Sequence, residues 1–253
     1  MHHPTMSKYY FEHDFTEFEE FITSYPAHHK YYEKGDIISA QSETLKYGYY
    51  IKQGIMKLSI GHECGKEKIA ALFGPGSFFP LGIDHHYYDM EYAMVEQAYT
   101  EVEAYEFDYR IVRTMFLEHQ DLALRMMEHY CDFTSYLFFE IASLSGDNSM
   151  AKVCNVLYAL HNTSLCRSHV LHISQDDVME LSGISKIQVA RVYQTLRGEH
   201  IIQTSRGKSR SSIRINSVPI ALMNCDCQLP DMDHYQSPRR LLPGNLPFPP
   251  ESG

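Results

Sequence analysis

Residues 174–199 read SQDDVMELSGISKIQVARVYQTLRGE, and this stretch decides how the C-terminal part of the chain folds. Ser174 and Ser185 each stand where a serine can cap the start of a helix, and Gly183 between them suits the turn that ends one. Apolar residues at helical spacing follow both serines, namely Val178 and Leu181, then Val189, Val192 and Leu196. Two short helices joined by a glycine turn form a helix-turn-helix.

The second predicted helix carries side chains that suit DNA. Its N-terminal end, which enters the major groove in this motif, holds Ser185, Lys186, Ile187, Gln188 and Arg191. Lysine, glutamine and arginine pair with base edges and phosphates.

A two-stranded wing is predicted directly after this helix. Ile201 and Ile202 are followed by a polar turn at 205–210 and by alternating residues at 212–215. Its basic side chains, Arg206, Lys208 and Arg210, suit the phosphates beside the groove. A packed helical hairpin without a DNA partner could imitate the motif, but the motif, the wing and the local charge together favour a DNA interface.

The charge distribution supports a separate DNA-binding module. The 253-residue chain has a net charge of −10, which by itself argues against a nucleic-acid partner. Residues 1–166 hold 12 basic and 24 acidic residues, whereas residues 167–215 hold 8 basic and 4 acidic ones. A small polyanion-binding module therefore follows a larger acidic domain with another role.

The region from Tyr31 to Phe107 is predicted to be a β sandwich or barrel. Short β-rich runs alternate with glycine turns, and the runs are Tyr49–Ile51, Met56–Ile60, Ile69–Phe73, Tyr92–Val95 and Val102–Phe107. Before them, aromatic residues at roughly helical spacing in residues 9–25 predict a short N-terminal helix.

A long helical segment follows Asp108, because no glycine occurs again until Gly146. Two apolar stripes run along its second part: Leu124, Met127, Cys131, Thr134, Phe138 and Ile141 form one, and Leu122, Met126, His129, Phe133 and Tyr136 the other. A helix apolar on two sides needs two covers, here the β domain and a second copy of the helix. The alternative is a helix buried inside one domain. Residues 145–148 suit a hinge, with a new helix from Ser149 to about His161.

These residues together resemble the CRP/FNR superfamily of bacterial transcription factors, over about residues 10–223. The specific marks are YEKGD at 32–36, YYIKQG at 49–54, GKE at 65–67, FGPGSFF at 73–79 and ISKIQVARV at 184–192. The resemblance implies an α+β fold with a cyclic-nucleotide-binding-like β-roll, a long dimerisation helix and a winged helix-turn-helix. The expected parts are an N-terminal helix and arm (1–28), the β-roll (29–108), the dimerisation helix (109–145), the DNA-binding domain (146–223) and a disordered proline-rich tail (224–253).

The departures from the family pattern argue against a cyclic nucleotide. Where cyclic-AMP-binding members place a glutamate and then an arginine for the phosphate, this chain has residues 79–82 (FPLG) and then Glu91-Tyr92. A carboxylate repels a phosphate. The adenine-reading pair of the long helix is replaced by Leu137-Phe138. An iron-sulfur cluster is not expected either, since no cysteine precedes Cys64.

The resemblance places an effector site between the β-roll and the long helix. Its expected lining is Phe78, Leu81, Glu91, Tyr92, Phe133, Tyr136 and Leu137. Such a lining suits a small aromatic or hydrophobic molecule, as with the chlorinated aromatic acids of the halorespiration regulators in this superfamily. The alternative is that these aromatic residues only fill the core.

Three other clusters of histidine or cysteine do not fit a site. His85-His86 suits a solvated loop better than a metal, the spacing of Cys166, His169 and His172 fits no common zinc site, and Cys225-x-Cys227 stands beside the proline-rich tail. No metal, cofactor or catalytic residue is therefore expected. The sequence also predicts reduced thiols, no membrane segment and a cytoplasmic protein.

The sequence thus predicts a dimeric transcription regulator, controlled by a small non-nucleotide effector. Its expected partners are an inverted repeat in double-stranded DNA, a second copy of the chain, the effector and RNA polymerase. The alternative is a ligand-independent or redox-responsive regulator whose β-roll is only a dimerisation scaffold.

Overall fold

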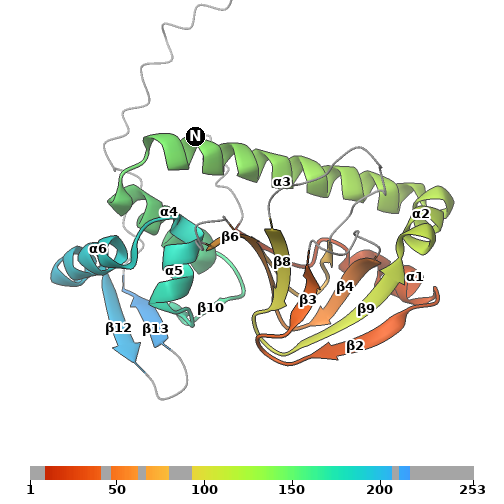
Figure 1. The fold of residues 1–253 in the computed structure, drawn as a ribbon, viewed down its shortest axis with the longest axis horizontal. Helices are drawn as coiled ribbons and strands as arrows, with labels where there is room; N and C mark the ends of the chain where they lie inside the picture. The colour runs from red at the N-terminus through yellow and green to blue at the C-terminus, as the bar shows by residue number, and fades with distance from the viewer. Residues whose placement is uncertain (1–8, 41–46, 62–66, 80–92, 207–210, 217–253) are drawn as a thin grey trace, which may run out of the picture.

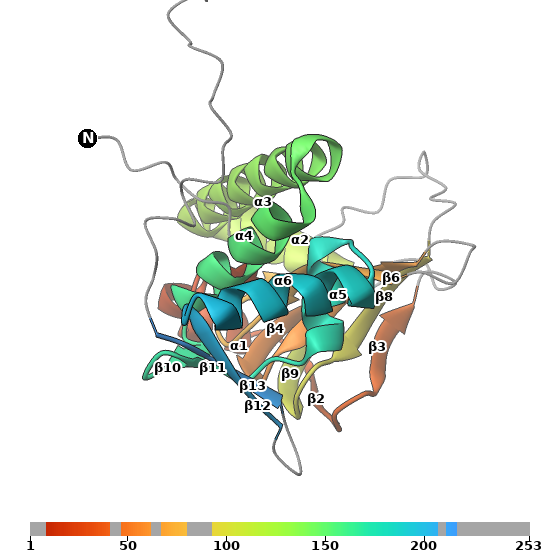
Figure 2. The same ribbon diagram turned by 90° about the vertical axis from the view of Figure 1, so that its left-hand side faces the viewer.

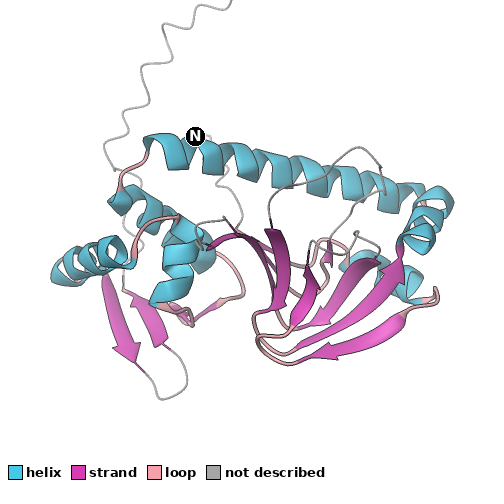
Figure 3. Ribbon diagram, viewed as in Figure 1, coloured by secondary structure: helices cyan, strands magenta, loops and turns pink. Residues whose placement is uncertain are grey.

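The computed structural model describes residues 9–40, 47–61, 67–79, 93–206 and 211–216. The chain forms a β-roll, a long helix that lies across it, and a small helical module with its own sheet (Figure 1). Strands and helices both contribute, as Figure 3 shows. The predicted α+β class is therefore confirmed.

Two sheets face each other in the β-roll. One has the strand order β1-β6-β5-β8-β3, and the other has the order β2-β9-β4-β7. The strands are β1 (Tyr10–Phe11), β2 (His28–Tyr32), β3 (Ile37–Ala40), β4 (Tyr47–Gln53), β5 (Met56–Gly61), β6 (Glu67–Phe73), β7 (Phe78–Phe79), β8 (Ala93–Ala98) and β9 (Val102–Asp108). The runs predicted as strands correspond to β4, β5, β6, β8 and β9. The shorter strands β1, β2, β3 and β7 were not predicted.

The turn between β4 and β5 shows why a glycine occurs at position 54. Gly54 has φ +89°, and a Cβ there would lie 1.9 Å from the carbonyl oxygen of Glu101. Any side chain would have to displace the backbone that leads into β9.

The N-terminal segment corrects one expectation. Instead of a helix over 9–25, residues 10 and 11 form β1, which pairs in parallel with β6, and helix begins only at η1 (Thr16–Phe18) and α1 (Glu19–Thr23). Three consecutive aromatic residues, Tyr9 to Phe11, are all at most 4% exposed. Extended backbone points alternate side chains to opposite sides: Tyr9 and Phe11 contact Tyr136 of the long helix, and Tyr10 lies against Gly74. The strand buries all three rings because it is covered on both sides.

Three helices follow β9: α2 (Tyr109–Glu118), α3 (Gln120–Gly146) and α4 (Ser149–His161). Asp108 caps α2 and Asn148 caps α4 through side-chain oxygens. In α3 the stripe with Leu122, Met126 and His129 is buried, whereas Met127 and Phe138 of the other stripe are 66% and 68% exposed. The helix therefore buries one apolar face and leaves the other uncovered.

The C-terminal module packs α4 against α5 (Gln175–Ser182), α6 (Lys186–Gly198) and a sheet of order β10-β11-β13-β12 (Figure 2). These strands are β10 (Cys166–Arg167), β11 (Val170–Leu171), β12 (Ile202–Arg206) and β13 (Ser211–Ile215). The predicted helix-turn-helix and wing are present, and β10 and β11 were not predicted. The proposed tail from 224 onwards lies outside the described residues, and the domain boundaries stay predictions.

Candidate nucleic-acid interface and effector region

The start of α6 is held by two residues that sequence reasoning assigned to DNA. The Ser185 hydroxyl accepts from the backbone N–H of Gln188, and the Gln188 side-chain oxygen accepts from the Ser185 N–H (3.0 Å) and hydroxyl (2.8 Å). This capping box satisfies N–H groups that no helical carbonyl can reach. Both side chains therefore have a structural role in the free protein, in addition to any DNA contact.

The outward face of α6 presents the remaining predicted residues. Ile187 is 66% exposed, Arg191 is exposed, and Lys186 Nζ lies 2.6 Å from Asp176 Oδ1 of the preceding helix. Lys186 can exchange this exposed carboxylate for a phosphate at little energetic cost, because exposed ion pairs contribute only about 0–1 kcal/mol.

Two further exposed residues on this face, Ala190 and Gln194, were missed by the sequence analysis. Their spacing of three to four from Ile187 and Arg191 was the available signal. Together these side chains form a surface along α6, which lies at the end of the molecule away from the β-roll (Figure 1).

The wing follows α6 and is tied to it. Arg197 donates from α6 to the Thr204 hydroxyl on β12 at 3.1 Å, a contact that the sequence analysis did not identify. Arg206 ends β12, while Lys208 and Arg210 lie outside the described residues. The exposed Arg214 on β13 adds a positive charge that was also missed.

The described residues of the predicted effector site fall into two separate clusters. Phe78 is fully buried and packs against Phe15, Tyr50 and Phe107. Phe133 and Tyr136 lie on the long helix and instead pack against Phe11 of the N-terminal segment. Leu137 is 37% exposed, and Leu81, Glu91 and Tyr92 lie outside the described residues. The structure thus does not bring Phe78 together with the helix residues.

The N-terminal segment fills the space beside Phe133 and Tyr136. Tyr9 and Phe11 make edge contacts with the Tyr136 ring at 5.2 and 6.2 Å between centroids. The buried Tyr136 hydroxyl donates to the carbonyl oxygen of Ala70, and burial raises its pKa above the ordinary range. Removing this side chain would open the core, so Tyr136→Ala cannot test an effector contact alone.

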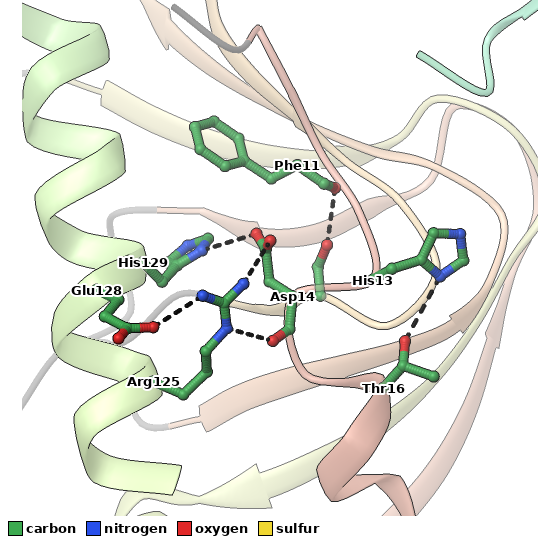
Figure 4. Close-up of polar contacts among 8 residues, drawn as sticks. Phe11, His13, Asp14, Thr16, Arg125, Glu128 and His129 are labelled. Carbon is green, nitrogen blue, oxygen red and sulfur yellow. Dashed lines mark hydrogen bonds and ion pairs between the residues drawn. The ribbon is translucent and has the colours of Figure 1, made fainter. Parts of the chain in front are cut away.

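A polar cluster holds the same segment against α3 (Figure 4). Asp14 Oδ2 lies 3.1 Å from Nδ1 of the buried His129, and Asp14 Oδ1 lies 3.2 Å from the guanidinium of Arg125. Arg125 also donates to the Asp14 carbonyl at 2.8 Å. These contacts join the N-terminal arm directly to the long helix.

Polar contacts also connect the β-roll with the helix-turn-helix. Tyr99 donates to Asp177 at 2.8 Å, in the first turn of α5, and Lys57 lies 3.6 Å from Glu180. Lys68 donates to the Leu181 carbonyl at 2.7 Å and lies 2.5 Å from Glu140 of α3. Lys68 thus connects the long helix to the last turn of α5.

The other candidate clusters show no ligand set. His85, His86, Cys225 and Cys227 lie outside the described residues. His169 contacts His161, with 3.1 Å between ring nitrogens, and within the described ranges no three His, Cys, Asp or Glu side chains are arranged to hold a metal. No described helix is both long enough and apolar enough to cross a membrane.

Residues 29–119 match the family model of the cyclic nucleotide-binding domain. No curated protein matches the chain. Among solved structures, FixK2 from Bradyrhizobium japonicum is 17% identical with a TM-score of 0.66, and the match covers 79% of this chain and 97% of FixK2. TTHA1359, a CRP/FNR family transcriptional regulator from Thermus thermophilus, is 18% identical with a TM-score of 0.58, covering 78% and 96%.

The chain has the CRP/FNR regulator fold. The expected resemblance and fold are thereby confirmed. CprK, solved with OCPA bound, matches at 19% identity and a TM-score of 0.60, covering 82% of this chain and 92% of CprK. FixK2 and TTHA1359 match this chain about as well as CprK does. These likenesses therefore do not favour one branch of the CRP/FNR proteins over another.

Proposed function

We propose that this protein is a dimeric, sequence-specific DNA-binding transcription regulator. The observation that carries the proposal is the exposed face of α6 with Lys186, Ile187 and Arg191, flanked by a wing, on a chain with the CRP/FNR fold. In a winged helix-turn-helix this face enters the major groove. Arginine bidentate to guanine is the commonest specific contact there, and the Ile187 side chain can contact only apolar groups such as a thymine methyl.

The uncovered stripe on α3 supports a dimer. Leu124, Met127, Phe138 and Ile141 are each more than half exposed along one face of a helix of 27 residues. An apolar seam of this length excludes water best against its own symmetric copy. A two-fold dimer places two α6 helices on one side, and it requires an inverted repeat with half-sites about one helical turn apart.

The proposal includes control of DNA binding by a small non-nucleotide effector. Support comes from the contacts that couple the arm, the long helix and α5, through Asp14, His129 and Lys68. A ligand that favours one arrangement of these elements would change how the two α6 helices are presented. Contact with RNA polymerase and a cytoplasmic location stay predictions.

The alternative is a regulator whose β-roll is only a scaffold. The observation that favours it is that Phe78, Phe133 and Tyr136, predicted to line a ligand, instead pack tightly among other aromatic rings. Under this alternative, DNA affinity would not respond to any small molecule.

The test is selection of binding sites from random DNA with the purified protein. We expect an inverted repeat whose half-site has a thymine at the base pair facing Ile187, and Arg191→Ala should lose discrimination at one guanine, by about 1–3 kcal/mol. Cyclic AMP at millimolar concentration should leave the affinity unchanged. No enrichment of any sequence would refute the proposal.

A further inference from the structure

A cleft separates the β-roll from the C-terminal module, which lies beside it under one end of α3 (Figure 1). Its volume is about 880 Å³. Small-molecule sites usually measure about 300–1,000 Å³, so the cleft has room for an organic ligand. Three parts of the chain line it: the N-terminal arm, the turns of the β-roll around Tyr99, and the module from β10 to the start of α5. The cleft is therefore separate from the predicted effector lining at Phe133 and Tyr136.

Two carboxylates line the cleft, and donors of the protein already occupy both. Glu12 of the arm accepts from the backbone N–H of Ser164 at 3.0 Å and from the Ser164 hydroxyl. Asp177 of α5 accepts from the Tyr99 hydroxyl at 2.8 Å, and from the Ser174 N–H at 2.9 Å and hydroxyl at 2.6 Å. These same hydrogen bonds join the module to the arm and to the β-roll.

Two cations line the cleft without such partners. Lys34 lies in the turn after β2, and the Gly35 N–H donates to the Ala98 carbonyl at 2.8 Å, which fixes that turn beside Tyr99. Its Nζ lies 5.9 Å from the centroid of the Tyr99 ring. Arg167, on β10, lines the cleft from the module. Both side chains are exposed, and within the described ranges neither forms an ion pair with a carboxylate.

This distribution of partners favours an anionic ligand over a cationic one. A cation would have to compete with the hydrogen bonds that Glu12 and Asp177 already accept. An anion meets Lys34 and Arg167, which hold no other carboxylate, and an arginine can bind a carboxylate through two parallel hydrogen bonds. The Tyr99 ring offers a surface for an apolar body between two anionic groups.

We propose that this cleft binds a small organic dianion, an aromatic dicarboxylate, with one carboxylate against Lys34 and the other against Arg167. One cation belongs to the β-roll and the other to the module that carries α6, so the bound dianion joins the two parts. A ligand that joins them favours one presentation of α6. The inference rests on the proposed function for this effector role, whereas binding itself needs no DNA.

The experiment uses the full chain and three probes that share a benzene ring: isophthalate with two carboxylates, benzoate with one, and the neutral diamide isophthalamide. Titration calorimetry at neutral pH and low salt measures the affinity for each. We expect isophthalate to bind at millimolar concentration or below, benzoate to bind at least tenfold more weakly, and isophthalamide not to bind. Binding of isophthalamide or benzoate as tightly as isophthalate would overturn the inference, as would the failure of isophthalate to bind.

Variants then locate the two contacts. Lys34→Gln and Arg167→Gln change exposed side chains, so both should fold, and each should weaken isophthalate binding at least tenfold, to the level of benzoate. Arg113→Gln removes an exposed arginine of α2 outside the cleft and should leave binding unchanged. Full affinity in either cleft variant would refute the assigned contact.

The effector role is tested on the selected operator. Saturating isophthalate should change the operator affinity of the unmodified chain, and an unchanged affinity would overturn this role. Site selection on DNA needs no dianion, so failure of the proposed function would appear there, while calorimetry reports failure of the cleft.

Discussion

Replacing Phe138 with glutamate should break the proposed dimer, and the structure sets the size of the effect. Phe138 lies in the uncovered stripe of α3 and is 68% exposed in the single chain. Burying a whole phenylalanine side chain stabilises by about 1.5–3 kcal/mol, so covering the exposed part contributes about 1–2 kcal/mol per chain. A symmetric dimer has two copies, which gives about 2–4 kcal/mol before the burial of two charges is added.

This difference is large enough to measure directly. At about 1.4 kcal/mol per tenfold change, the dissociation constant of the dimer should rise by about 30-fold to several hundredfold. Sedimentation equilibrium over a range of protein concentrations measures that constant, and binding to the selected operator should weaken in parallel.

A matched control separates the seam from a general effect of an added charge. Leu117 on α2 is 75% exposed and lies outside the stripe, so Leu117→Glu should leave the dimer intact. If Phe138→Glu dissociates no more than Leu117→Glu, or binds the operator fully as a monomer, the assignment of the dimer seam is wrong.

Three further changes test other parts of the structure. Glu96 has a pKa of about 8 when folded and 4.5 as its reference, so the folded chain keeps a proton that the unfolded chain loses, and the free energy of unfolding should fall as pH rises between these values. The slope from this group is at most about 1.4 kcal/mol per pH unit, and Glu96→Gln should flatten it in urea titrations between about pH 6 and about pH 8. Gly54→Ala should destabilise the β-roll by about 2 kcal/mol or more, because the added Cβ meets the Glu101 carbonyl at a positive φ, and a thermal melt with no change would contradict this. Tyr136→Phe should cost about 1 kcal/mol by removing the hydrogen bond to Ala70 while keeping the ring, and a loss above about 3 kcal/mol in chemical denaturation would show that the hydroxyl does more.

The elements that the sequence predicted correctly depend on local signals. Ser174, Gly183 and Ser185 mark the boundaries of α5 and α6, because capping and a left-handed turn need only neighbouring residues. The two stripes of α3 were separable because a helix has a fixed period, and one stripe proved buried and the other exposed.

The tertiary structure alone decided what surrounds each residue. Tyr10 and Phe11 form a strand because they pair in parallel with β6, and the rings of Tyr9 and Phe11 then pack against Tyr136, a residue predicted to line the effector site. Gln188 was assigned to DNA from its type, yet the folded helix start engages it as a cap. Glu96 carries no signal in its sequence neighbourhood, since its burial depends on a second sheet that closes over it from residues far away in the chain. Desolvation is a property of the whole packed core, so the raised pKa of Glu96 that follows from it is not encoded in any local pattern.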